Sequence, residues 1–152
     1  MKLIVAGLIA MSAQASLATQ PPTAATAAVT QPVTVEYYYR VRWGSMDEFL
    51  RLYRANHEPV LRALLEAGFI TRIDTEQPFT HMAGGTRWDL RVTIVFRDGE
   101  AAVGSGGPYD QAAMAATRRL FPDRDAHAAA EIRRFGLLEE HWDVIVTPVS
   151  AD

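Results

Sequence analysis

Hydrophobic and polar residues alternate at the beginning of the patterned part of the chain. From residue 33 to residue 43 the odd positions are apolar or aromatic, whereas the even ones include Glu36, Tyr38, Arg40 and Arg42. A period of two is typical of a strand with one apolar face. The pattern therefore predicts a strand over these residues.

A helical spacing follows the first strand. Apolar side chains recur every three or four positions over residues 46–65, and an Ala-Gly pair then provides a stop signal. Ser45 and Glu48 match a capping box, in which each side chain bonds the backbone of the other residue. Pro59 removes one backbone donor inside this pattern, so we expect a kink or a break at residues 56–58.

The middle of the chain predicts two more strands. Residues 69–76 form the first of them, and residues 77–87 read as a loop. Residues 88–97 alternate most clearly of all, with large apolar side chains at every even position. Asp98 and Gly99 are typical turn residues, and they predict a turn directly after this strand.

The last third of the chain predicts two helices and a strand. A glycine-rich connection over residues 104–108 leads to helices over residues 110–121 and 125–140. The residues of the second helix expected to be buried are Ala128, Ile132, Phe135 and Leu138. Residues 142–149 predict the final strand, and Pro148 near its end indicates an edge position.

The order of the predicted elements is β-α-β-β-α-β. This order predicts an α+β fold of the ferredoxin-like type, with an antiparallel sheet that is covered by helices on one face. In that topology the first strand lies between the third and the fourth. One domain over residues 33–150 is expected, because the patterned stretch has the length of a single hydrophobic core.

Several segments together resemble a known superfamily. They are the aromatic strand at residues 36–41, the helical segments at residues 57–61 and 65–68, and the strands around residues 88–92 and 142–144. With these segments the chain resembles the dimeric α+β barrel superfamily, which includes antibiotic-biosynthesis-type monooxygenases, EthD-like proteins and NIPSNAP-like proteins.

The resemblance covers residues 33–149 and carries implications for assembly and ligands. It implies a dimeric α+β barrel in which two sheets pair face to face. It also implies, for many members, a small aromatic or haem-type ligand between sheet and helices. No catalytic residue carries over, because the sequence does not match the Asn, Trp and His combination of the haem-degrading monooxygenases.

The N-terminal residues predict export. A basic residue at position 2, an apolar run over residues 3–11 and a small-x-small site at residues 13–15 are the three parts of a signal peptide. The apolar run is too short for a bilayer core, which takes roughly 20 residues, so no stable membrane anchor is expected. We expect a signal peptide over residues 1–15, cleaved there or a few residues later, and a disordered linker over residues 16–32. The mature protein would then be periplasmic or secreted.

Composition narrows the chemistry. The sequence contains no cysteine, which excludes a disulfide framework, thiol catalysis and cysteine metal ligands. The formal net charge of -3 comes without a basic patch, so nucleic acid is not an expected partner. The four histidines show no short metal-ligand spacing, and neither a metal nor any other cofactor is predicted.

Charged and aromatic side chains on the polar faces of three predicted strands form one candidate binding surface. They are Tyr38, Arg40, Arg42, Asp89, Arg91 and Asp143. Arginine forks on such a surface can hold a carboxylate or a phosphate, and Tyr38 can stack on a ligand. The alternative is a network of salt bridges, either solvated or buried where two sheets meet in a dimer.

Two histidines are candidates for acid–base chemistry. His57 lies on the apolar stripe of the first helix beside the expected kink, where it can serve as a general base or as a satisfied core residue. His81 lies in the 77–87 loop, close in sequence to Phe79, Met82 and Trp88, a composition that suits either the rim of a pocket or a surface loop.

The sequence leaves three functions open. The first is an exported, homodimeric domain that binds a small molecule between the sheet and the first helix. The second is a cofactor-independent or haem-using monooxygenase, or an isomerase, that acts on a small aromatic substrate with His57, His81 or Arg91 in its site. The third is a structural or protein-partner module.

Overall fold

The computed structural model of the chain describes residues 31–149. The expected signal peptide over residues 1–15 lies outside the described residues, as do linker residues 16–30 and residue 150.

Four strands form one antiparallel sheet. They are β1 (Val33–Val41), β2 (Ile70–Glu76), β3 (Leu90–Phe96) and β4 (Leu138–Val146), in the spatial order β2-β3-β1-β4. β1 pairs with β3 on one side and with β4 on the other, and β2 pairs with β3. The ferredoxin-like fold predicted from the sequence is confirmed, and so is the edge position of the last strand.

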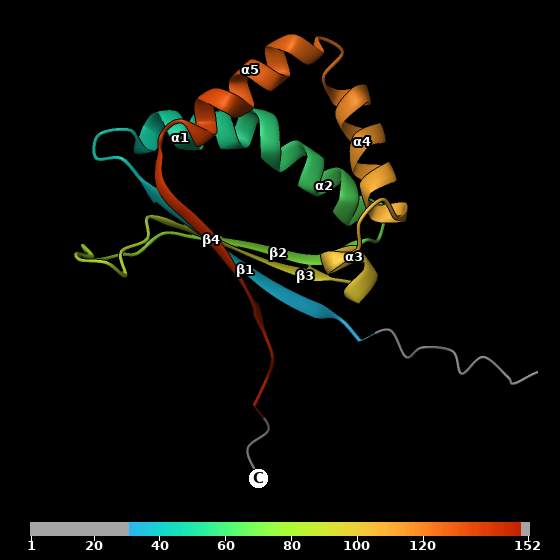
Figure 1. Ribbon diagram of the computed structural model, residues 1–152, viewed down its shortest axis with the longest axis horizontal. Coiled ribbons are helices and arrows are strands. Elements are labelled where there is room, and N and C mark those ends of the chain that lie inside the picture. The colour runs from blue at the N-terminus through green and yellow to red at the C-terminus, as the bar shows by residue number, and fades with distance from the viewer. Residues whose placement is uncertain (1–30, 150–152) are drawn as a thin grey trace, which may run out of the picture.

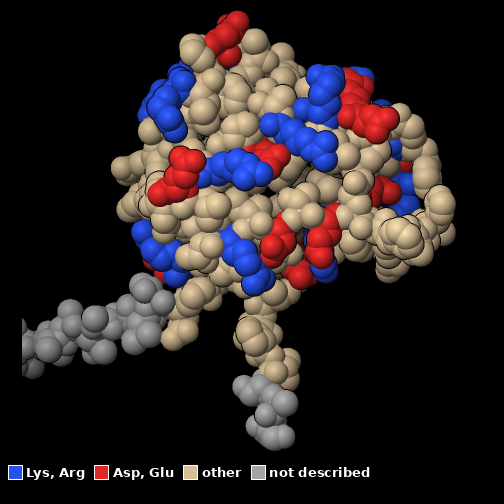
Figure 2. Space-filling model, turned by 180° about the vertical axis from the view of Figure 1, so that it is seen from behind, with Lys and Arg blue, Asp and Glu red and all other residues tan. Residues whose placement is uncertain are grey.

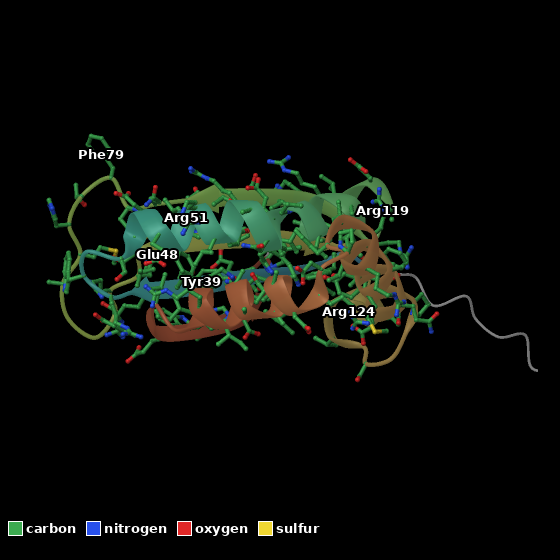
Figure 3. The ribbon with its side chains drawn as sticks, turned by 90° about the horizontal axis from the view of Figure 1, so that it is seen from above. Tyr39, Glu48, Arg51, Phe79, Arg119 and Arg124 are labelled. Atoms are coloured by element: carbon green, nitrogen blue, oxygen red, sulfur yellow. The ribbon has the colours of Figure 1, made fainter. Side chains whose placement is uncertain are left out.

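The helices lie on one face of this sheet (Figure 1). In chain order they are α1 (Met46–Leu52), a π-helical turn (Tyr53–His57), α2 (Glu58–Glu66), α3 (Gly99–Val103), α4 (Pro108–Leu120) and α5 (Arg124–Phe135). Figure 3, seen from above the helices, shows α5 running beside the first helix, and α4 closes one end of this layer. The sheet therefore has a covered inner face and an open outer face.

The core fills the space between the inner face and the helices. Alternate residues of β1 and β3 point into it, since side chains of a strand alternate between its two faces. Val35 and Val92 from the sheet and Phe49 and Leu64 from the first helix are almost fully buried there. The alternation predicted for the two central strands thus becomes the inner face.

The first helix contains the expected irregularity. Instead of a break, the chain forms a π-helical turn over Tyr53–His57, in which the Glu58 N–H donates to the Tyr53 carbonyl five residues earlier. Pro59 lies in the first turn of α2 and cannot donate to the carbonyl of Ala55. The wider turn accommodates this missing bond, and such turns occur frequently at functional sites.

Two local predictions are wrong. The capping box does not form, because the Glu48 carboxylate binds the Arg133 guanidinium of α5 with two contacts of 2.8 Å, and within residues 31–149 Ser45 makes no side-chain cap. Asp98 does not begin a simple turn. Its carboxylate accepts a 2.8 Å hydrogen bond from Ala101 N–H, and this caps the short helix α3.

The predicted boundary between the last helix and the last strand is also wrong. α5 ends at Phe135, and residues 138–140, which were predicted to be helical, belong to β4. Their backbone groups pair with β1, where Val41 lies opposite Leu138. The strand ladder therefore outweighs the helical propensity of these residues, which is a weak preference for any single position.

The predicted buried face of α5 is wrong as well. Ile132 is 74% exposed, whereas Arg134 is 1% exposed. The helix packs on α1 and on the π-helical turn through the side that carries Glu131 and Arg134, a pair three residues apart. Ala128 and Ile132 are instead turned outward, and Phe135 is half-exposed.

β4 presents its residues to the two faces in a way that the sequence did not predict. Asp143 lies opposite Tyr37, so its side chain is on the inner face and not with Arg40 on the outer one. Trp142 lies opposite Tyr38 and is therefore on the outer face. The reason is that β4 takes its register from its ladder with β1, not from the burial of its own apolar residues.

Candidate functional site

The predicted binding residues of the outer face are largely occupied by one another. Arg40 forms an ion pair with Glu140 and donates a 3.0 Å bond to the Gly85 carbonyl. Arg91 Nη2 lies 2.5 Å from a carboxylate oxygen of Glu76. Basic and acidic side chains are interspersed on the side of the molecule that Figure 2 shows. An anionic ligand would have to displace these carboxylates.

Tyr38 and Asp89 also have partners within the chain. The Tyr38 hydroxyl donates to Glu36 over 2.5 Å, and its ring stacks on Trp142 at 5.3 Å between centroids and 6° between planes. Asp89 accepts a 2.8 Å bond from the Val41 N–H and so joins the 77–89 segment to the end of β1. Tyr38 and Arg91 lie on one face, whereas Asp89 secures the end of the strand.

His81 lies in a separate pocket at the end of the sheet. The pocket has a volume of about 350 Å³ and is formed by the loop after β2 and the turn after β1. The residues that line it include Trp43, Met46, Phe79, His81, Met82 and Trp88. Phe79 points away from the body of the protein (Figure 3) and is fully exposed. The loop residues grouped from the sequence thus surround one open pocket.

A second cavity lies inside the fold, between the sheet and the helices, with a volume of about 170 Å³. Its lining comes from seven elements and consists of Tyr37, Tyr39, His57, Leu61, Val92, Ile94, Tyr109, Arg134, Phe135 and His141. Figure 3 shows Tyr39 between the first helix and α5. This inner cavity contains one residue that the sequence singled out, His57.

Arg134 is the buried cation of the inner cavity. Its Nε and Nη2 atoms donate to the two carboxylate oxygens of Glu131 over 3.1 and 2.7 Å. Its Nη1 atom is buried and finds no hydrogen-bond partner within residues 31–149. Arg40 Nε and Arg87 Nη1 are in the same condition, but neither residue lines this cavity. Arg134 therefore combines two features, because it lines the cavity and one of its nitrogens has no hydrogen-bond partner among the described residues.

Three tyrosines keep their hydroxyl protons at neutral pH. Burial raises the pKa of Tyr39 to about 12, against an opposing effect of Arg134. Burial also raises the pKa of Tyr37, with smaller contributions from Tyr109 and Asp143, and it raises the pKa of Tyr109 itself. The phenols of the lining can therefore donate hydrogen bonds to a ligand.

His57 is neutral at physiological pH. Burial and, secondly, the charge of Arg134 lower its pKa to about 4, although Glu131 acts in the opposite direction. Its Nδ1 atom is 3.8 Å from a Glu131 oxygen, and its ring is 5.4 Å from that of Tyr53. A neutral imidazole has one ring nitrogen that can accept a proton and one N–H that can donate a hydrogen bond, so it can act as a base.

Sequence reasoning missed Arg134 and His141 as site residues. Arg134 was overlooked because the apolar stripe of α5 pointed to the opposite side of the helix. His141 stacks on Tyr39 with 4.3 Å between ring centroids, and its position was hidden by the misplaced start of β4. The only available signal was the Glu131–Arg134 spacing, which is common on exposed helices.

Two kinds of site are not found in the part of the chain that is described. Among residues 31–149 no three His, Asp or Glu side chains are grouped as metal ligands. None of the helices in this range has the length and apolar character needed to cross a membrane.

The chain matches no protein-family profile and no curated protein sequence. It is similar to a dimeric protein of ferredoxin-like fold from Bacteroides fragilis, with 16% identity and a TM-score of 0.42, over 77% of this chain and 97% of that one. A NIPSNAP family protein from Agrobacterium tumefaciens has 18% identity and a TM-score of 0.45, over 81% and 90%. An EthD family protein from Bacillus halodurans has 14% identity and a TM-score of 0.46, over 78% and 100%. These names agree with the resemblance drawn from the sequence, and the fold assignment itself rests on strand order and pairing.

Proposed function

We propose that the protein is an exported domain that binds a small organic molecule in the inner cavity. The observation that carries this proposal is Arg134, a buried cation that lines the cavity and whose Nη1 atom has no hydrogen-bond partner within residues 31–149. A buried donor without an acceptor costs free energy, and a ligand that supplies the acceptor would recover it.

The size and lining of the cavity define the ligand. Cavities of about 150 Å³ are known to hold benzene, so 170 Å³ is enough for one ring with a small substituent. Apolar contacts come from Leu61, Val92 and Ile94, and aromatic contacts from Tyr39 and Phe135. The lining combines this apolar and aromatic surface with the polar groups of one arginine, two histidines and three tyrosines, which suits a small organic molecule that carries polar atoms.

A pair of substitutions in one strand tests this function. Val92 of β3 faces the cavity, whereas Val95 of the same strand lies opposite Thr34 on the outer face. Val92→Phe should fill the cavity and abolish binding of single-ring probes in ligand-observed NMR, while Val95→Phe should retain it. If the wild-type protein binds none of a broad set of such probes, the function is wrong and a structural or partner-binding role takes its place.

A second function, catalysis of a proton transfer, is favoured by His57. Its imidazole is neutral, lines the same cavity and lies near Glu131, an arrangement that can move a proton on a bound ligand. An isomerase or a cofactor-independent monooxygenase would use such a base. Turnover of a small phenol or quinol, followed by absorbance and oxygen uptake, should then be lost in His57→Gln and kept in His81→Gln. Equal turnover in both variants would exclude this role for His57.

The outer face of the sheet supports a homodimer. Trp142 stacks on Tyr38 there, and the neighbouring Val144 is 44% exposed. Aromatic side chains in the centre of a polar surface are typical of protein interfaces. Light scattering at micromolar concentration should give the mass of two chains, and Val144→Asp should reduce it to one. A wild-type protein with the mass of one chain would contradict the proposed homodimer.

Export completes the proposal and has a direct test. The full-length chain, expressed in a Gram-negative host, should be recovered from the periplasm with the mass expected after cleavage near residue 15. Intact protein in the cytoplasm would contradict it.

A further inference from the structure

We infer that the ligand of the inner cavity is an organic anion of single-ring size, whose acid group is bound by Nη1 of Arg134. This inference rests on the proposed function and makes it more specific, because it names the chemical class of the ligand.

The first argument is the geometry of Arg134. Glu131 occupies Nε and Nη2 in a bidentate pair, which leaves the N–H groups of Nη1 for another acceptor. The Arg134 side chain is 1% exposed, whereas that of Glu131 is 22% exposed. Water therefore reaches the carboxylate of this pair more easily than the cation. Charge-assisted bonds from arginine to a carboxylate are among the strong hydrogen bonds of proteins.

The second argument is the balance of donors and acceptors around the cavity. Arg134 and the phenols of Tyr37, Tyr39 and Tyr109 supply donors, and none of the described residues that line the cavity is acidic. The tyrosine hydroxyls stay protonated, because burial raises their pKa. A wall rich in donors favours a ligand that brings acceptor oxygens.

The third argument is the position of the rim. Phe135 is 49% exposed while it also lines the cavity, and its ring is 6.1 Å from that of His141 on the edge strand β4. The Arg134 Cζ atom lies 4.5 Å from the centroid of the Phe135 ring. A flat ligand that enters between α5 and β4 would therefore meet the guanidinium directly behind this aromatic rim.

Benzoate and its neutral analogues benzamide and benzyl alcohol provide the test. They share a ring and differ in charge, so isothermal titration of the wild-type protein isolates the contribution of the anion. Benzoate should bind roughly 10- to 100-fold more tightly than either neutral compound, as expected for a buried hydrogen bond to a charged group. Equal affinities for the three compounds would overturn the inference while the proposed cavity function stands. Absence of binding by all three would overturn both.

Variants of α5 locate the anion. Arg134→Met should lower benzoate affinity at least about tenfold and leave benzamide affinity almost unchanged. Arg133→Met is the matched control, because Arg133 is the adjacent arginine and its partner is Glu48 outside the cavity. If Arg134→Met does not fold, Glu131→Gln combined with Arg134→Met removes both charges, and Arg134→Lys retains the cation. Equal benzoate binding by the Arg134 and Arg133 variants would contradict the assignment.

Discussion

Arginines on the two sides of the sheet have carboxylate partners, but they differ in how far water reaches them. On the outer face the Arg91 side chain is 30% exposed and its partner Glu76 is 50% exposed. On the inner side, the Arg134 side chain of α5 is 1% exposed, and one of its nitrogens has no hydrogen-bond partner within residues 31–149. Water can solvate Arg91 when its carboxylate moves away, whereas Arg134 then needs another buried acceptor.

This difference in exposure changes what each charge costs the folded protein. A matched pair in water contributes little stability and can be removed at low cost. A buried arginine is expensive to retain unless its donors are used, and this cost is the reason for proposing a ligand at the cavity that Arg134 lines. The surface that looked richest in chemistry in the sequence is therefore the less informative of the two.

The largest expected effect comes from removing the carboxylate of the inner pair. Glu131→Gln should lower the free energy of unfolding by about 3 kcal/mol, because it leaves Arg134 buried without a counter-ion. Glu76→Gln makes the same chemical change opposite Arg91 and should cost less than about 1 kcal/mol. Urea unfolding of the two variants measures both values. Equal losses would mean that the two faces do not differ.

An intermediate effect is expected from acid. The pKa of His57 is lowered to about 4 in the folded protein, whereas an unfolded chain has about 6.5. As pH falls from 6.5 to 4, His57 becomes protonated in the unfolded state but stays neutral in the folded state. The free energy of unfolding therefore decreases in that pH range. The groups that face His57 are Arg134, Glu131 and His127 of α5 and His141 of β4.

The size of this acid effect can be measured by urea unfolding between pH 7 and pH 4. We expect a loss of about 1–2 kcal/mol, reduced from the full linkage value because the His57 side chain is 35% exposed. His57→Gln should remove this component of the pH dependence, whereas His81→Gln in the exposed loop should leave it in place. An unchanged profile in His57→Gln would show that another group is responsible.

The smallest effect is expected on the outer face. Tyr38→Phe removes the hydroxyl that donates to Glu36 but keeps the stack on Trp142, so it should cost about 0.5 kcal/mol. Tyr38→Leu removes the stack as well and should cost about 1 kcal/mol more. Thermal unfolding of both variants checks the order. A larger loss in Tyr38→Phe than in Tyr38→Leu would assign the stability of this face to its polar contacts.

The sequence predicted the fold well where local pattern and tertiary burial agree. Buried and less buried residues alternate along β1 and β3 because one face of each strand packs against the helices. Pro59 in the sequence correctly predicted an irregularity in the first helix. Prediction failed where partners distant in the chain decide the outcome. The start of β4 is set by its ladder with β1, and Glu48 binds Arg133 instead of capping its own helix.

The inner cavity was only partly predictable for the same reason. His57 could be singled out because it lies on an apolar stripe beside a kink. Arg134 could not, since a polar residue beside Ile132 and Phe135 reads as the solvent side of a helix. Its burial depends on how α5 lies on α1 and on the π-helical turn, and no periodicity in the sequence encodes that orientation.

The π-helical turn at Tyr53–His57 also bears on how this site could change over generations. A turn of this kind holds one residue more than the α-helix around it, and each residue of an α-helix adds about 100° of rotation. Loss of a single codon, for example that of Asn56, would restore a regular helix and rotate α1 relative to His57 and α2. One short deletion could thus change how α1 packs against α5 while His57 and Leu61, which both line the cavity, keep their relative positions.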